Sequence, residues 1–92
     1  MRLGEVRIKA ELTGVEGWRL HGKRITRLFI FEDFLGGIRF LNRVAKLAEA
    51  MNHHPDIDIR YNRIKLSLTT HDEGGLTTKD FRLARQINRI RN

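Results

Sequence analysis

The sequence predicts an α+β fold, a two-layer sandwich in which a four-stranded antiparallel sheet has helices packed on one face. Residues 18–31 and 57–68 have the residue patterns of two β-hairpins, and the segments between and after them have helical spacing. Hairpin strands are antiparallel, and such a sheet commonly keeps one face in water, so all helices are expected on the other face. The length of 92 residues predicts a single domain, 1–92.

The N-terminal third of the chain predicts a short helix and then the first hairpin. Within the first dozen residues, Leu3, Val6 and Ala10 lie partly on one side of a helix. Further on, polar residues alternate with apolar ones, Gly22-Lys23 supplies a turn, and residues 25–31 are rich in branched and aromatic side chains. This run therefore predicts a strand that pairs with the residues before the turn.

Residues 32–51 predict a long amphipathic helix. Two neighbouring rows of apolar residues recur at steps of three and four and form one broad face: Phe34, Ile38, Leu41, Ala45 and Ala48, and Phe40, Val44, Leu47 and Met51. Asp33 is a suitable N-cap, and Pro55 requires the helix to end by His54. Gly36-Gly37 weakens the helix, and close packing on the sheet would explain the pair.

The second hairpin and the last helix complete the fold. Ile57, Ile59 and Tyr61 alternate with polar residues, as do Ile64, Leu66 and Leu68, with Asn62-Arg63 between the two runs. After a loop at 72–75, the residues from Thr77 to Asp80 resemble a capping box that starts a helix. Its expected buried stripe is Leu83, Ala84, Ile87 and Ile90.

Composition narrows the class of protein. The chain has no cysteine and no apolar run near the roughly 20 residues that cross a bilayer, so we expect a cytoplasmic protein without membrane contact. Its net charge of +7 attracts polyanions, but the basic residues are spread along the sequence. We therefore do not expect nucleic acid as a partner, and we keep nucleic-acid binding only within an alternative function.

Three of the four histidines fall at the ends of predicted elements, where functional sites are usually built. His53 and His54 close the long helix, His71 closes the last strand, and Asp80 lies in the first turn of the last helix. The adjacent histidines point in different directions and no HxxxH or HxH spacing occurs, so we expect no metal and no cofactor. Imidazoles with pKa values near neutrality suit acid–base catalysis better.

The spacing Glu49-x3-His53-His54-Pro55-x5-Tyr61-x9-His71-x8-Asp80 resembles the signature of the pterin-4a-carbinolamine dehydratase family. The segments FEDF, RVAKLAE, YNRI and THDEGGLTTKD also resemble it, as does Gly17-Trp18, so the likeness covers roughly residues 17–90. It implies metal-independent dehydration of 4a-hydroxytetrahydropterin to quinonoid dihydropterin, which recycles the cofactor of aromatic amino-acid hydroxylases. It also implies a homodimer or homotetramer.

The resemblance further implies a role for each site residue. His53 and His71 would be the acid and the base, in either order, and His54 would hold the pterin, so the catalytic set is His53, His54 and His71. The substrate-binding set would be Glu49, Pro55, Thr70 and Asp80. Ile57 occupies a position at which some members have a tryptophan beside the pterin, so it would cover the ring without aromatic stacking.

Two alternatives stay open beside the enzyme. One is a protein-interaction or nucleic-acid-binding module, because some relatives serve as dimerisation partners of a transcription factor. The other is a family member with a different physiological role, such as a molybdopterin-linked one. A titration with duplex DNA at several salt concentrations separates the module from the enzyme.

Overall fold

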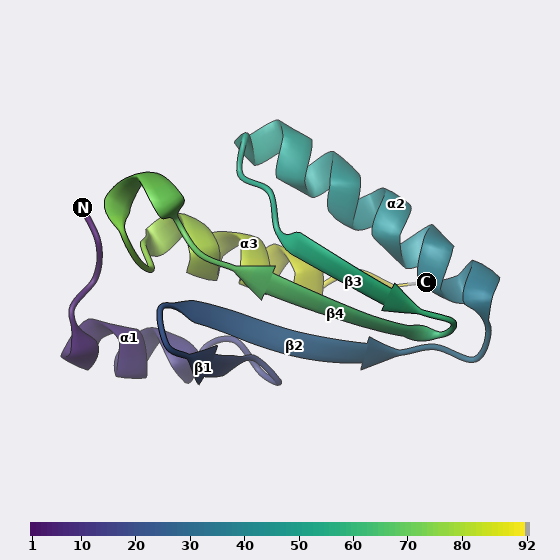
Figure 1. The fold of residues 1–92 in the computed structure, drawn as a ribbon, viewed down its shortest axis with the longest axis horizontal. Helices are drawn as coiled ribbons and strands as arrows, with labels where there is room; N and C mark the ends of the chain where they lie inside the picture. The colour runs from purple at the N-terminus through teal and green to yellow at the C-terminus, as the bar shows by residue number, and fades with distance from the viewer. Residues whose placement is uncertain (92) are drawn as a thin grey trace.

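The computed structural model describes residues 1–91, and these form a sheet with helices (Figure 1). The elements in chain order are α1 (Glu5–Leu12), β1 (Arg19–His21), β2 (Arg24–Ile30), α2 (Phe34–Met51), β3 (Asp56–Arg60), β4 (Arg63–Leu68), the 3₁₀ turn η1 (His71–Glu73) and α3 (Thr78–Asn88). All strand pairs are antiparallel and the strand order is β1-β2-β4-β3. The predicted α+β sandwich is thereby confirmed.

The alternation along β4 decides which face of the sheet is covered. Ile64, Leu66 and Leu68 are completely buried, whereas Arg63 and Lys65 are exposed. The buried set packs with apolar residues of both long helices, such as Phe40 of α2 and Phe81 of α3. The helices therefore cover one face, and the other face meets water as expected.

The start of α2 agrees with the sequence in detail. The Asp33 side chain accepts a hydrogen bond from the backbone N–H of Gly36 at 2.8 Å and caps the helix. A Cβ on Gly37 would lie 3.0 Å from Ile64 Cδ1, so the glycine lets α2 approach β4 closely. Burial is uneven along the two predicted apolar rows: Phe40 and Val44 are buried, whereas Phe34 and Ala45 are exposed.

The second hairpin turns one residue earlier than predicted. Its two-residue loop is Tyr61-Asn62, since Arg60 pairs with Arg63. Asn62 fixes this position: its side chain donates to the carbonyl of Phe31 at 2.8 Å, and its own carbonyl accepts from the Phe31 N–H. Tyr61 therefore lies in the turn with φ of 53° and is 67% exposed, which corrects its expected place on the apolar face.

The N-terminal helix is attached at the edge of the core. Leu3, Ile8 and Leu12 pack against the core, but Val6, which we expected on the same side, is exposed. Glu11 of α1 binds Arg85 of α3 at 3.0 Å. Among residues 1–91, no helix combines the length and the apolar character needed to cross a membrane.

Candidate active site

His53 takes its position from the way in which α2 ends. The helix stops at Met51, and Asn52 adopts the left-handed conformation with φ of 51°, which turns the chain sharply. The N–H groups of Asn52 and His53 both donate to the carbonyl of Ala48, so this end of the helix is closed. Pro55, half-buried, then directs the chain into β3.

A short hydrogen bond joins the end of α2 to the start of α3. His53 Nε2 lies 2.6 Å from Asp80 Oδ1, and the two side chains are 10% and 0% exposed. An ionised carboxylate only accepts hydrogen bonds, so Nε2 of His53 carries the proton of this hydrogen bond. The contact therefore fixes the tautomer of His53 and leaves Nδ1 as the nitrogen that can accept a proton.

Nδ1 of His53 is not fully buried. Among residues 1–91, no buried side-chain nitrogen or oxygen lacks a hydrogen-bond partner. His53 Nδ1 has no such partner, so it cannot be buried, although the ring as a whole is nearly covered. Nδ1 therefore stays available for a further hydrogen bond or a proton.

The second oxygen of Asp80 is held by the loop before α3. Thr70 Oγ1 donates to Asp80 Oδ2 at 2.8 Å, and the backbone N–H of Thr77 donates to the same oxygen at 2.9 Å. Because the one hydroxyl proton of Thr70 is used on Asp80, Thr77 Oγ1 donates to Thr70 Oγ1 at 2.8 Å. The expected capping box is confirmed, and its acid also orients His53.

His54 points to a different partner. Its Nε2 lies 2.5 Å from Glu49 Oε2, and both side chains are largely exposed to solvent. Exposed ion pairs stabilise a fold only slightly, because water screens the charges and both side chains lose rotamer freedom. The pair therefore presents the second imidazole at the surface without burying it.

His71 lies on a small closed loop and not at the end of a strand. β4 ends at Leu68, and His71 begins η1, which corrects the position expected from the sequence. Thr70 and Gly75 close the loop through two backbone hydrogen bonds, of 3.1 and 3.3 Å. Residue 71 is exposed and carries its imidazole on this loop.

One hollow of about 340 Å³ brings most of the candidate residues together. Its lining residues are Asn52, His53, His54, Thr69, Thr70, His71, Asp72 and Lys79. Asp80 and Glu49 do not line it and contribute through His53 and His54, and Pro55 does not line it either. Lys79 also lines the hollow, and the sequence analysis did not single it out, because an exposed lysine in a first helical turn carries no distinctive signal.

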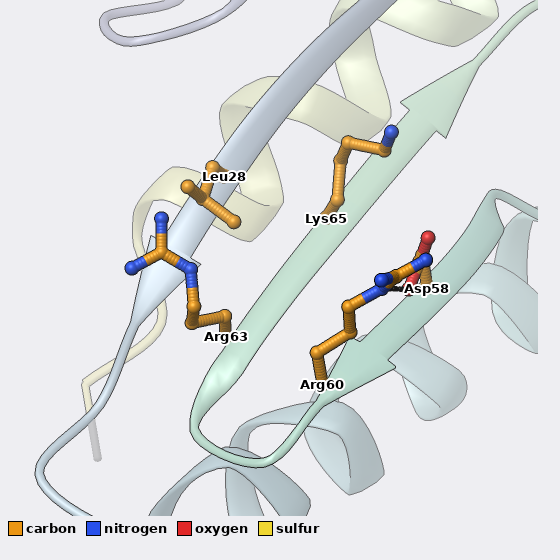
Figure 2. A pocket seen from close by; sticks show the side chains of 5 residues that line it. All are labelled: Leu28, Asp58, Arg60, Arg63 and Lys65. Carbon is orange, nitrogen blue, oxygen red and sulfur yellow. Dashed lines mark hydrogen bonds and ion pairs between the residues drawn. The ribbon is translucent and has the colours of Figure 1, made fainter.

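Two further observations bear on what the site can hold. Among the residues that the structure describes, no group of three or more histidine, aspartate or glutamate side chains is arranged to bind a metal ion. A separate hollow of about 180 Å³ lies on the outer face of the sheet (Figure 2) and is lined by Leu28, Asp58, Arg60, Arg63 and Lys65. That hollow shares no lining residue with the histidine hollow.

Comparison with known proteins agrees with this architecture. Residues 1–90 match the family described as pterin 4 alpha carbinolamine dehydratase. A protein of Chloroflexus aurantiacus, provisionally named a pterin-4-alpha-carbinolamine dehydratase, is 53% identical over 97% of this chain and 96% of its own. A relative from Sulfolobus acidocaldarius with the same provisional name is 42% identical over 98% and 99% of the two chains.

Solved structures show the same fold. The crystal structure of a transcriptional coactivator/pterin dehydratase from Brucella melitensis superposes with a TM-score of 0.92, at 38% identity, over 96% of each chain. A pterin dehydratase-like protein described as a RuBisCO assembly factor in the alpha-carboxysome has a TM-score of 0.68 at 22% identity, over 82% of this chain and 89% of its own. The latter likeness concerns the fold alone.

The fold and the hollow define a small α+β protein with imidazoles gathered around one end of its sheet. The chain belongs to the pterin-4-alpha-carbinolamine dehydratase family. Like the members of that family, it is a hydro-lyase.

Proposed function

We propose that this protein removes water from a 4a-hydroxytetrahydropterin, giving the quinonoid dihydropterin, by histidine acid–base catalysis without a metal. The observation that carries the proposal is the His53–Asp80 hydrogen bond at the edge of a hollow that His54 and His71 also line. A histidine whose tautomer is fixed, next to further imidazoles, supplies a proton acceptor and a proton donor in one place.

The reaction needs one proton added and one removed. Protonation of the 4a-hydroxyl lets the C4a–O bond break and water leave, while the N5 lone pair forms a C4a–N5 double bond. The resulting cation then loses a proton from a ring nitrogen, so the catalyst ends with as many protons as it had. No electrons enter or leave the pterin, and no redox partner is required.

The geometry favours His53 as the base. Its Nε2–H is used on Asp80, so its open Nδ1 accepts the proton, and the carboxylate then faces an imidazolium. Among residues 1–91, no carboxylate forms an ion pair with His71, which serves as the acid. His54, with Glu49 behind it, holds the pterin. Thr70 and Asp80 act as positioning residues for His53, and Pro55 sets the path of the chain after the histidine pair.

A dehydratase assay on freshly generated 4a-hydroxytetrahydropterin tests this function. We expect turnover well above the spontaneous rate, retained after exhaustive treatment with a chelator, and saturable pterin binding that disappears when His54 is replaced. Activity that is lost with the chelator and restored by a divalent metal would contradict the metal-free mechanism. The absence of any acceleration across acidic to alkaline pH would contradict the function itself.

We also propose that the chain works as one domain, in the cytoplasm, and as a homodimer or homotetramer. Support for the oligomer comes from apolar side chains left uncovered along the edge strand β3 and the start of α2: Phe34, Leu35, Ile57 and Ile59. Ile57 is 48% and Ile59 40% exposed, although both share the inner face with buried β4 residues. A second copy would cover them. Light scattering at several concentrations measures the oligomer.

The outer face of the sheet supports a second candidate function, as a protein-interaction or nucleic-acid-binding module. Arg60, Arg63 and Lys65 lie together there on β3 and β4 (Figure 2). Within residues 1–91, only Arg60 of these three has an acidic partner, Asp58 at 3.4 Å. Tight duplex-DNA binding that falls steeply with salt and is lost in Arg63→Ala/Lys65→Ala would favour this candidate. Lys23→Ala/Arg24→Ala, which removes the same charge elsewhere, is the matched control.

A further inference from the structure

A second hollow adjoins the histidine hollow. It measures about 430 Å³ and is lined by His21, Gly22, Lys23, Arg24, Thr69, His71 and Gly74. Thr69 and His71 line both hollows, so the two meet at these residues. Both volumes lie in the lower part of the range of about 300–1,000 Å³ that is usual for small-molecule sites. The histidine hollow thus continues into a space of similar size beyond His71.

The turn between β1 and β2 forms the far wall of this second hollow. His21 pairs with Arg24 across the turn, and Gly22 takes the left-handed conformation with φ of 59°. The Thr69 hydroxyl donates to the Lys23 carbonyl at 2.6 Å and so ties the turn to the segment after β4. Because Thr69 belongs to both hollows, this hydrogen bond holds the turn beside the candidate site.

The second hollow is electropositive. No carboxylate is among its lining residues, whereas Lys23 and Arg24 both line it. Within residues 1–91 Lys23 has no acidic partner, and Arg24 only approaches Asp56, with 3.8 Å between Nη1 and Oδ2. Arg24 is also 48% exposed, so its guanidinium remains accessible. An unpaired Lys23 and an exposed Arg24 whose one ion pair is long leave positive charge in a concave wall, which favours an anionic ligand group.

The chemistry of the proposed substrate relates the two hollows. C4a, where water leaves, is bonded to N5, and N5 is bonded to C6, which carries the side chain of natural pterins. A histidine that exchanges protons at C4a or N5 therefore lies next to the C6 substituent. If the ring lies among the histidines and His71 acts at C4a, the C6 side chain lies near His71, which also lines the second hollow.

From this arrangement we propose that the enzyme prefers pterins whose C6 side chain carries an anionic group, and that Lys23 and Arg24 bind that group. The inference rests on the proposed function, because it takes the ring to lie in the histidine hollow. The group that Lys23 and Arg24 would bind is an anion on the pterin side chain, either a phosphate ester or a carboxylate. A phosphate offers more acceptor oxygens to Lys23 and Arg24 than a carboxylate does.

The test compares three stable, oxidised pterins by quenching of their intrinsic fluorescence. One has a neutral polyhydroxylated C6 side chain, the second has the same chain with a terminal monophosphate, and the third has a carboxylate on C6. We expect the phosphate compound to bind about fivefold more tightly than the neutral one at low salt, a preference of the size that exposed ion pairs give. The preference should decrease as salt is raised.

Two variants of equal charge show where the preference arises. In Lys23→Ala/Arg24→Ala the ratio of the two dissociation constants should fall to about one, whereas Arg63→Ala/Lys65→Ala should keep the wild-type ratio. Both dissociation constants are measured on the same variant, so a loss of affinity that is equal for the two compounds does not change their ratio. Preference for the carboxylate compound alone, abolished by the same variant, would identify a carboxylate as the anion and also support the proposal.

Failure of this inference is distinguishable from failure of the proposed function. Equal binding of all three pterins by an enzyme that dehydrates the neutral substrate would overturn the inference and leave the function intact. An anion preference that persists in Lys23→Ala/Arg24→Ala would overturn it equally. If no pterin is bound or dehydrated, the proposed function fails and the inference fails with it.

Discussion

His53 and Asp80 are joined by a hydrogen bond of 2.6 Å between Nε2 and Oδ1, although they lie 27 positions apart in the chain. The first residue follows the end of α2 and the second lies in the first turn of α3. The same carboxylate completes the capping box of α3 through Thr77 and accepts the hydroxyl of Thr70. One buried acid thus links the stability of α3 to the orientation of the proposed base.

Replacing this acid by its amide separates the two roles. In Asp80→Asn we expect kcat to fall about 100-fold, because the fixed tautomer and the charge that faces the imidazolium are both lost. The free energy of unfolding should fall by only about 1 kcal/mol, since the amide oxygen can still accept part of the capping bonds. Steady-state kinetics and urea unfolding measure the two effects. A normal kcat with reduced stability would show that Asp80 is only structural.

The exposed histidine of the η1 loop can be removed without disturbing the core. In His71→Ala we expect loss of most dehydratase activity and an unchanged free energy of unfolding. The side chain is exposed and, in the part of the chain that the structure describes, has no buried partner to leave unpaired. Arg63→Ala, at an exposed position of β4 outside the histidine hollow, is the control and should keep wild-type kinetics. Full turnover by His71→Ala would remove it from the mechanism.

The ion pair between Glu11 of α1 and Arg85 of α3 makes a contribution to stability that depends on pH. The hydrogen bond from Arg85, followed by that from Arg7, lowers the pKa of Glu11 from its ordinary value of 4.5. A lowered pKa in the folded state stabilises the protein above pH 4.5, and this contribution is lost as the pH falls through the folded-state pKa. Glu11→Gln should therefore be less stable than wild type near pH 7 by about 0.5–1 kcal/mol, and the difference should vanish in acid.

Thermal or urea unfolding from pH 7 down to pH 3 measures this difference. Glu5→Gln is the matched control, since Glu5 lies on the same helix but is exposed and has no ion pair among the described residues. A stability difference for Glu11→Gln that stays constant over the whole range would contradict the assigned pairing.

The close approach of α2 to the sheet predicts an unusual effect of alanine. Alanine at position 37 should favour the helix by about 1 kcal/mol through its propensity alone. Its Cβ would, however, lie 3.0 Å from Ile64 Cδ1 in the filled core. We expect Gly37→Ala to lower the free energy of unfolding by about 1–3 kcal/mol, the usual cost of overpacking. A more stable variant in urea unfolding would show that Ile64 can move aside.

Much of the fold and the site was accessible from the sequence because local rules governed them. The cap at Asp33, the capping box from Thr77 to Asp80 and the alternation along β4 are short-range patterns, and the structure has all three. The spacing of His53, His71 and Asp80 predicted their convergence only through the resemblance, since no local rule states which loop meets which helix end.

What the sequence could not predict depends on contacts between distant segments. The Tyr61-Asn62 turn is set by hydrogen bonds to Phe31, which belongs to the other hairpin. Ile57 and Ile59 follow the alternation of a buried strand yet stay partly exposed, because within one chain nothing covers this edge of the sheet completely. The place of Lys23 beside His71 likewise depends on the tertiary hydrogen bond from Thr69.

The measurement that tests the central claim most directly is the initial rate of 4a-hydroxytetrahydropterin dehydration by wild type and His53→Ala. Thermal unfolding of both proteins in the same buffer verifies that the variant is folded. We expect wild type to exceed the spontaneous rate clearly and folded His53→Ala to lose most of that excess, because no base faces the substrate. Undiminished turnover by folded His53→Ala would contradict catalysis by the His53–Asp80 pair.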